Sequence, residues 1–337
     1  MKPREIFMCS LNRKSVPRPS TGSVTSIVTV DLMEKTGVYF PDAHTDSEKM
    51  ARLAAAGYTE LGFDCVMPLF SVAHGSSSMG CNYDWGEIDR MPDCKEHLYK
   101  IGDDIRIPSD LLKRPACKVA LEAIAKLKKW HGDEIAVVGK VFGPWTLGYH
   151  VFGVQEFLIN TVLNPDEIRR AMATLKEVTV RFGKAQIEAG ADALCLADHA
   201  TRDLCSPDTY VEFLQDMHIE LRERLDCPVV LHICGDTSDR IPFIGKTGIE
   251  CFHFDSKTGT KTAKDLAGDS LALMGGTSNL DIVKDGTPET IRADVAEKIA
   301  CGIEIIGPEC AVPLDAPHIN MKILAEEVKK QASSADN

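Results

Sequence analysis

The protein has 337 residues, of which 44% are hydrophobic and 26% charged, a mixture typical of a globular chain and not of a disordered one. Its 38 Lys and Arg residues against 50 Asp and Glu give a formal charge of −12, which argues against a nucleic-acid-binding surface. The sequence has no uninterrupted apolar run of about 18 residues, so we expect no membrane span.

The first part of the chain predicts two strands and two helices before an irregular region. Residues 1–20 lack the apolar core of a secretory signal and predict a short helix before a Pro-rich turn. The β-branched run at 22–30 and the apolar run at 63–68 each predict a strand. Between them, the sequence Thr-Asp-Ser-Glu opens a predicted helix over 46–57. Residues 71–115, rich in Gly, Ser, Asp and Pro, predict an irregular insertion or lid.

From residue 134 onward, short apolar runs alternate regularly with helical patterns. The predicted strands are 134–144, 190–198, 227–235, 248–255, 270–275 and 302–307, and the predicted helices are 164–189, one opened by Ser206, 236–244, 261–267, 288–301 and 317–330. Near-continuous apolar strands separated by helices indicate a parallel sheet. The first strand is not followed by a Gly-x-Gly-x-x-Gly turn, which favours a (β/α)8 TIM-type barrel over a dinucleotide-binding sheet. We expect residues 1–337 to form a single barrel domain.

Reactive side chains gather at the predicted carboxyl ends of these strands, where barrel enzymes carry their active sites. They are Asp198, His199, His232, Cys234, Asp255, Asn279 and Cys310. Asp255 and Asp198 are candidate catalytic carboxylates, and Asn279 and His199 are candidate cofactor-binding residues. The alternative for Asp255 is an N-cap of the next turn, and the alternative for Asp198 is a cap or a salt bridge with Arg202.

The sequence His232-Ile233-Cys234 predicts a metal site. Residues i and i+2 of an extended chain point to the same face, so both side chains can reach one centre. Cys310, after another strand, can supply a third ligand. One imidazole and two thiolates suit Zn²⁺, and three protein ligands leave a fourth position open for catalysis. The alternative is that these residues are ordinary core residues, as we expect for most of the 12 cysteines, whose reduced thiols favour the cytoplasm.

Four segments carry a resemblance to a known family: GADALCLADHATRDLCSPDTYVEF, PVVLHICGDTSDRIPFIGKTGIECFHFD, LMGGTSNLDIVKDGTPETI and IIGPECAVPLDAP. They resemble the uroporphyrinogen decarboxylase superfamily and, within it, the zinc-containing methylcobamide:coenzyme M methyltransferases of methanogenic archaea. The resemblance implies one zinc per chain, held by His232, Cys234 and Cys310, with Asp255 matching a carboxylate near the metal. It also implies methyl transfer from a methylated corrinoid partner protein, which supplies the corrinoid, to the thiol of coenzyme M.

Two other functions stay open at this point. A tetrapyrrole decarboxylase would use Asp198 and no metal, but decarboxylases of this family carry an Arg-rich segment near the N-terminus. The matching stretch here, SVTSIVTVDLMEKTG, has no arginine. A non-catalytic corrinoid-binding subunit would keep the fold and lack methyl transfer.

Overall fold

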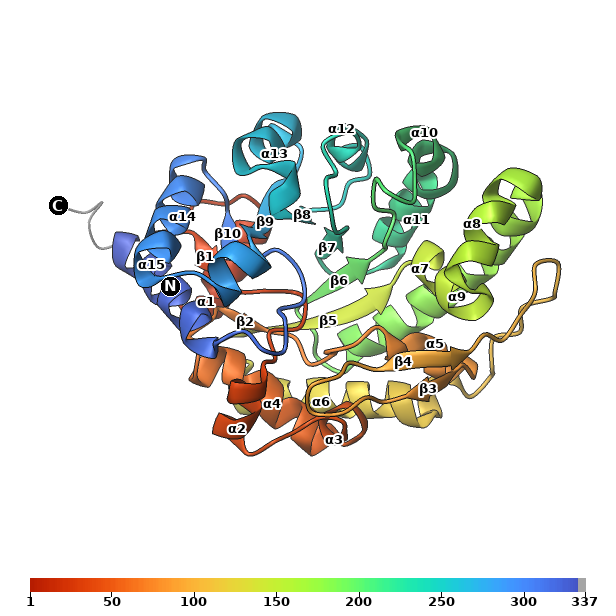
Figure 1. The fold of residues 1–337 in the computed structure, drawn as a ribbon, viewed down its shortest axis with the longest axis horizontal. Coiled ribbons are helices and arrows are strands. Elements are labelled where there is room, and N and C mark those ends of the chain that lie inside the picture. Colours follow the sequence, from red (N-terminus) through yellow and green to blue (C-terminus); the bar gives the residue numbers. More distant parts are fainter. Residues whose placement is uncertain (333–337) are drawn as a thin grey trace.

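Eight parallel strands form the centre of the computed structural model, which describes residues 1–332 (Figure 1). They are β1 (Ser20–Thr21), β2 (Cys65–Val66), β5 (Ala136–Phe142), β6 (Ala193–Ala197), β7 (Val229–His232), β8 (Cys251–Phe254), β9 (Ala272–Thr277) and β10 (Ile305–Pro308). Their order in the sheet is β1-β10-β9-β8-β7-β6-β5-β2. All seven residues of β5 are buried, as expected of a parallel strand covered on both faces.

The sheet closes where β1 meets β2. The backbone N–H of Asp64 donates to the carbonyl of Thr21 at 2.8 Å, and the N–H of Thr21 donates to Asp64 Oδ2 at 2.9 Å. The Arg18 guanidinium binds both oxygens of the same carboxylate, at 2.7 and 2.8 Å, and the Ser20 hydroxyl donates to it at 2.9 Å. These contacts complete a barrel, and the predicted (β/α)8 fold is confirmed.

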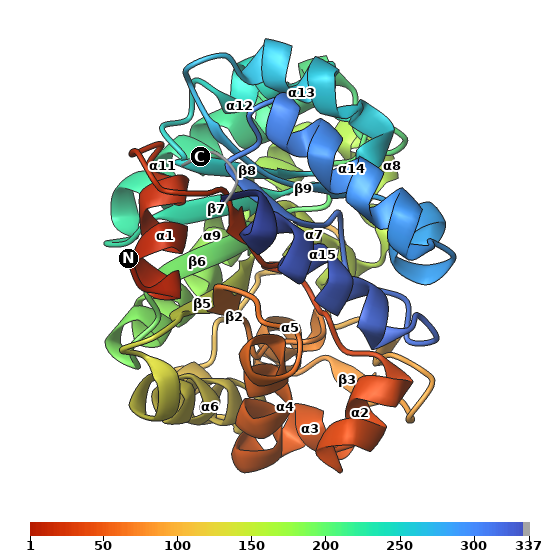
Figure 2. The ribbon, with the colours of Figure 1, turned by 90° about the vertical axis from the view of Figure 1, so that its left-hand side faces the viewer.

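Helices surround the barrel on its outside (Figures 1 and 2). They are α1 (Pro3–Leu11), α2 (Val30–Thr36), α3 (Asp42–Thr45), α4 (Ser47–Thr59), α5 (Ala73–Met79), α6 (Pro115–His131), α7 (Pro144–Phe152), α8 (Val154–Leu163), α9 (Pro165–Glu188), α10 (Pro207–Tyr210), α11 (Asp216–Arg224), α12 (Ile241–Ile244), α13 (Thr260–Ala267), α14 (Pro288–Ala300) and α15 (His318–Ala332). Among the described residues, no helix combines the length and the apolar character that crossing a bilayer requires.

Helix α1 covers the amino end of the barrel (Figure 2). The N–H of Arg4 donates to the carbonyl of Glu134, just before β5, and the Arg4 guanidinium binds Asp192, just before β6, at 2.7 Å. The carboxyl ends of the strands therefore lie at the opposite end.

Capping residues set several helix starts as the sequence predicted. Asp46 accepts hydrogen bonds from the N–H groups of Glu48 and Lys49, both at 2.9 Å, and Ser206 accepts one from Thr209 at 3.1 Å. The long helix α9 begins after Asn164 as expected, but no side-chain cap forms there.

The strand predicted at 22–30 is wrong. The chain leaves the sheet after Thr21, and the buried hydroxyls of Ser23 and Thr25 hydrogen-bond to each other at 2.8 Å. Thr29 instead caps α2 by accepting from Leu32 N. Ser and Thr side chains satisfy nearby polar groups locally in this way and compete with a strand ladder.

The insertion at 71–115 contains more regular structure than the sequence predicted. It holds α5, an antiparallel hairpin of β3 (Asn82–Asp84) and β4 (Asp93–Glu96), and a 3-10 turn at Leu111–Lys113. The hairpin strands are short and largely exposed, so they lack the alternating hydrophobic pattern that identifies a strand. The sequence also predicted no elements where α6, α7 and α8 lie.

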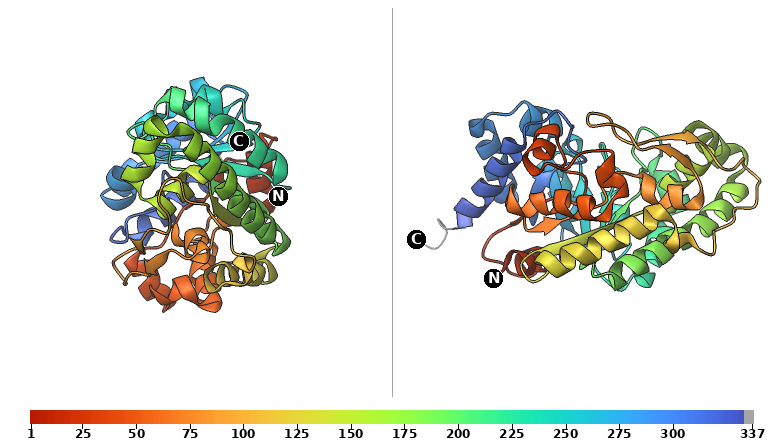
Figure 3. Two further views of the ribbon diagram at one scale, coloured as in Figure 1. Left: turned by 90° about the vertical axis from the view of Figure 1, so that its right-hand side faces the viewer. Right: turned by 90° about the horizontal axis from the view of Figure 1, so that it is seen from below.

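Helices α6 and α9 run beside each other on the outside of the barrel (Figure 3).

Candidate metal centre

Three side chains meet at the carboxyl end of the barrel. His232 ends β7, Cys234 lies two residues later, and Cys310 lies two residues after the end of β10. His232 Nε2 is 3.1 Å from Cys234 Sγ and 3.4 Å from Cys310 Sγ, and the two sulfurs are 3.2 Å apart. We call these three residues the His-Cys-Cys trio.

Backbone carbonyl groups orient the two histidines at this end of the barrel. His232 Nδ1 donates to the carbonyl of His253 at 3.2 Å, so its Nε2 faces the two sulfurs with a free lone pair. The His253 ring lies 4.6 Å from the His232 ring, and its Nε2 donates to the carbonyl of Pro308 at 2.8 Å. These contacts link β7, β8 and β10 just below the trio.

Two consecutive glycines make room for this arrangement. Gly275 and Gly276 both have positive φ, +95° and +74°. A Cβ atom at Gly275 would lie 2.5 Å from the His253 ring, and one at Gly276 would lie 2.3 Å from the Phe254 ring. Gly275 therefore allows His253, and Gly276 allows Phe254, to pack directly against β9.

The two sulfurs of the trio lie within hydrogen-bond distance of each other, at 3.2 Å. Their hydrogen bond lowers the pKa of Cys310 well below its usual value, with the nearby His232 acting in the same direction, and raises the pKa of Cys234. By contrast, burial is the largest cause that raises the pKa of Cys195 to about 12, as expected of a thiol within the core.

The donor set of the trio fits zinc. Thiolate and imidazole donors around a tetrahedral zinc lie about 3.5–3.8 Å apart, given bond lengths of about 2.3 and 2.0 Å. The separations in the trio, 3.1–3.4 Å, are about 0.1–0.6 Å shorter than that spacing, so small side-chain shifts would open the trio around a metal ion.

Asp198 is buried and fully occupied by other contacts. One carboxylate oxygen accepts from the N–H of Thr146 at 2.8 Å and from its hydroxyl at 3.1 Å. The other is 3.1 Å from His218 Nε2, whose Nδ1 contacts the Tyr210 hydroxyl at 3.0 Å. This geometry gives Asp198 a role in holding α7 and α11 to β6. The salt bridge considered for it is wrong, because Arg202 pairs with Asp236 at 2.6 Å.

Asp255 lies beside the trio but is held by backbone groups. Its Oδ2 accepts from the N–H of Gly235 at 2.8 Å, and its Oδ1 accepts from Lys257 at 3.0 Å. The second contact is the N-cap that the sequence suggested as an alternative. Among the described residues, the carboxylate does not belong to the group whose ligand atoms lie within 4.8 Å of one another.

The remaining two candidates lie at the same end of the barrel. Burial lowers the pKa of His199 to about 4, with His232 close enough to act in the same direction. Asn279 donates from Nδ2 to the carbonyl of Ala311 at 2.9 Å, while its Oδ1 is buried without a partner. Asn279 thus supports the loop that carries Cys310.

Two residues near the trio were not identified from the sequence. Glu309 accepts from the N–H groups of Ser256 and Asn279, both at 2.8 Å, and so joins three strand ends. Its position directly before Cys310 could have identified it from the sequence. Lys140 could have been identified as a charged residue inside the apolar run of β5.

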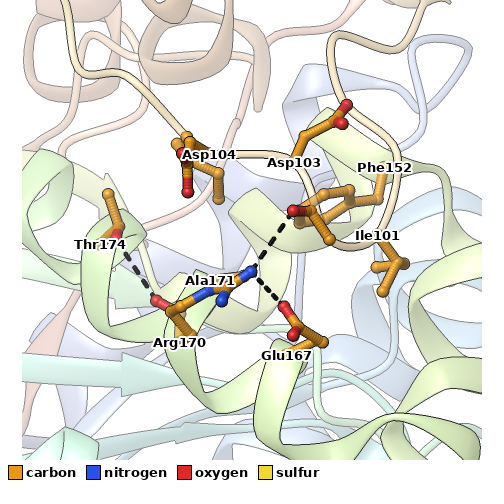
Figure 4. A pocket seen from close by; sticks show the side chains of 10 residues that line it. Ile101, Asp103, Asp104, Phe152, Glu167, Arg170, Ala171 and Thr174 are labelled. Atoms are coloured by element: carbon orange, nitrogen blue, oxygen red, sulfur yellow. Dashed lines mark hydrogen bonds and ion pairs between the residues drawn. The ribbon is translucent and has the colours of Figure 1, made fainter.

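A separate cavity of about 250 Å³ lies between the insertion and α9, away from the trio (Figure 4). Arg170 spans it, paired with Glu167 and donating to the carbonyl of Gly102 at 3.3 Å. This arginine is fully engaged in attaching the insertion to α9.

Known proteins resemble this chain in both sequence and fold. A methylated-thiol–coenzyme M methyltransferase from Methanosarcina mazei is 31% identical over 303 residues, covering 90% of this chain and 82% of the relative. A methylcobamide:CoM methyltransferase MtaA from Methanosarcina barkeri is 31% identical over 321 residues, covering 94% and 95%. The solved structure of a methyltransferase from Methanosarcina mazei superposes with a TM-score of 0.95 at 28% identity, covering 98% and 99%.

A family model covers almost the whole sequence. The model described as uroporphyrinogen decarboxylase (URO-D) matches residues 2–331. The match includes every strand of the barrel and all three residues of the trio. The chain therefore belongs to the uroporphyrinogen decarboxylase family, and methylcobamide:CoM methyltransferases are among its relatives.

Proposed function

We propose that this protein transfers a methyl group from a methylated corrinoid protein to the thiol of coenzyme M, with one zinc ion held by His232, Cys234 and Cys310. The observation that carries the proposal is the convergence of these three donors, within 3.1–3.4 Å of one another, in a chain whose relatives include methylcobamide:CoM methyltransferases. The free cysteines of the described chain suit the reducing cytoplasm, where we place the protein.

The chemistry requires a thiolate at neutral pH, because the thiolate and not the thiol is the nucleophile. Zinc, when bound, would supply the positive charge that removes the thiol proton. The sulfur then forms a bond to the methyl carbon as the cobalt–carbon bond breaks, and the electron pair of that bond stays on cobalt. The thiol proton leaves to solvent.

The chain's own residues position this reaction. His232 is 1% exposed and is kept in one tautomer by the His253 carbonyl. Cys234 and Cys310 come from loops that Asp255 and Asn279 hold in place. This support keeps the donors preorganised, as a metal site with an open position requires.

Two observations disfavour a decarboxylase that uses Asp198. Both oxygens of that carboxylate are taken by Thr146 and His218, and the residue is fully buried. The N-terminal stretch 23–37 has no arginine to bind the acidic groups of a tetrapyrrole.

Metal analysis and a methyl-transfer assay test the proposal together. The purified protein should contain about one zinc per chain, and Cys234→Ala or Cys310→Ala should lose most of the zinc and nearly all transfer from methylcobalamin to coenzyme M. Cys301→Ala, a half-buried thiol outside the trio, is the matched control and should retain both. Full activity in zinc-free protein would refute the metal mechanism, and zinc binding without transfer would favour a non-catalytic corrinoid-binding subunit.

A further inference from the structure

Lys140 lies in the middle of β5 and points into the barrel. A Cβ atom at Gly139 would lie 2.5 Å from Gln186 of α9, and Val141 also faces that helix, opposite Gly183. Because side chains alternate along a strand, Lys140 must face the interior. It is 5% exposed, and its ammonium lies 5.4 Å from the centre of the Phe142 ring.

The Lys140 ammonium forms no ion pair with a carboxylate. Its backbone N–H and carbonyl are both bound by the Gln186 amide, at 2.8 and 2.9 Å, but within residues 1–332 its Nζ takes part in no ion pair or hydrogen bond. Lys298, which is also buried, pairs with Asp294. A buried ammonium without a partner is strongly unfavourable, so Lys140 lowers the stability of the folded protein.

The strand register places Lys140 in the barrel interior close to the trio. Lys140 pairs with Cys195 of β6, and Cys195 pairs with Val230 of β7, two residues before His232. The groups that act electrostatically on Lys140 are the thiols of Cys195, Cys310 and Cys234, and no carboxylate is among them. Two thiolates would offset the charge of a divalent zinc, so a metal-loaded trio would not neutralise the lysine either. Burial lowers the Lys140 pKa, because the charged ammonium is poorly solvated inside the barrel and has no carboxylate beside it.

We propose that Lys140 binds the anionic end group of the thiol substrate whose sulfur meets the His-Cys-Cys trio. This inference rests on the proposed function and names the residue that binds the sulfonate of its thiol substrate. A buried, unpaired ammonium in a largely apolar barrel binds such an anion through a charge-assisted hydrogen bond. The cost of its burial is then recovered only when the correct substrate is present.

The first test measures binding without any chemistry. Calorimetric titration of the purified protein with ethanesulfonate, which has no thiol, should show binding that Lys140→Met weakens about 10- to 100-fold. Lys140→Arg should retain part of it, and the exposed Lys261→Met, which removes a cation outside the barrel, should leave it intact. Equal affinity in the Lys140→Met variant would overturn the proposal.

The second test separates specificity from folding. In the methyl-transfer assay, Lys140→Met should lower the ratio of kcat/KM for 2-mercaptoethanesulfonate over 2-mercaptoethanol about 10- to 100-fold, whereas a merely structural role would affect both thiols equally. The variant should fold, and its thermal midpoint without ligand should rise because an unpaired buried charge is removed. A thermal midpoint of Lys140→Met below that of the unaltered protein would contradict the view that the Lys140 ammonium is unpaired. If the unaltered protein transfers no methyl group but binds ethanesulfonate through Lys140, the proposed function fails and the anion site stands.

Discussion

At the scale of single residues, the sequence predicted the three residues of the trio but not the backbone groups that orient them. His232 and Cys234 share a face because they are two residues apart at a strand end, and Cys310 follows another strand end in the sequence. The groups that orient them are backbone carbonyls of His253 and Pro308, which every residue possesses. No sequence pattern reveals which carbonyl a histidine will meet, so this layer appears only in the structure.

Substitution of Gly275 tests that supporting layer. In Gly275→Ala, the new methyl group would collide with the His253 ring, 2.5 Å away, and shift the carbonyl that orients His232. We expect zinc affinity to fall about 10- to 100-fold, the range typical when a group that orients a metal ligand is lost. Gly248→Ala is the control, because its φ is also positive, at +78°, but nothing lies within 4 Å of the new Cβ. Competition with a chromogenic chelator measures the zinc affinity of both variants. An equal loss of zinc affinity in the two would indicate that backbone strain alone is responsible.

Asp255 can be tested as a fourth zinc ligand. Its two oxygens accept from the N–H groups of Gly235 and Lys257, so we expect Asp255→Ala to keep its zinc and to loosen the loop that follows Cys234. X-ray absorption at the zinc edge should show an oxygen or nitrogen neighbour replaced by sulfur when coenzyme M is added. A zinc loss as large as that of the cysteine variants would identify Asp255 as an anchoring ligand.

At the scale of elements, the accuracy of prediction followed strand length and burial. Strands β5 to β10 have four to seven buried residues each and were found close to their predicted positions. Strands β1 and β2 have only two residues each, so their ends depend on contacts with Asp64 and not on a local pattern. The insertion was recognised as a distinct segment, but its hairpin depends on packing against other elements.

The insertion contains His74 and contacts His44 and His150, and these buried neutral histidines should respond to acid. Burial lowers the pKa of His44 to about 3 and those of His74 and His150 to about 4. Between these values and pH 6.5 the unfolded chain binds protons that the folded protein does not, so the free energy of unfolding falls as the pH falls. Each histidine contributes about 1.4 kcal/mol per pH unit below 6.5.

Limited proteolysis and hydrogen exchange measure this response. We expect amides of 71–99 to lose protection between pH 7 and pH 5.5, before the strands of the barrel do. His131, whose ring lies 5.8 Å from that of Tyr58 and is outside this group, provides the comparison: His131→Gln should leave the acid response unchanged, whereas His150→Gln should reduce it. An acid response that His150→Gln does not alter would contradict the assignment.

At the scale of the whole molecule, the barrel closes at a single buried carboxylate. Asp64 receives hydrogen bonds from Arg18, Ser20 and Thr21, and its side chain is fully buried. Asp64→Ala leaves the Arg18 charge without its partner and should lower the free energy of unfolding by about 3–5 kcal/mol. Chemical denaturation measures the loss. Asp192→Ala, which removes a carboxylate that also pairs with cations but lies outside the β1–β2 junction, should cost less.

We further propose that the barrel of the described residues 1–332 unfolds as one unit, which calorimetry would show as a single transition with equal calorimetric and van't Hoff enthalpies. Two separate transitions would instead indicate that the insertion or the N-terminal part folds independently.

The position of Cys310 in the trio also sets an order of events during synthesis of the chain. Cys234 leaves the ribosome 76 residues before Cys310, and β10, which pairs with β1, emerges between them. Until then β1 has no neighbour on that side, and only two of the three donors exist, too few to hold zinc firmly. The zinc site that we propose would therefore be complete only once β10 has emerged and can pair with β1, so zinc binding by a nascent chain would report that its first and last strands have met.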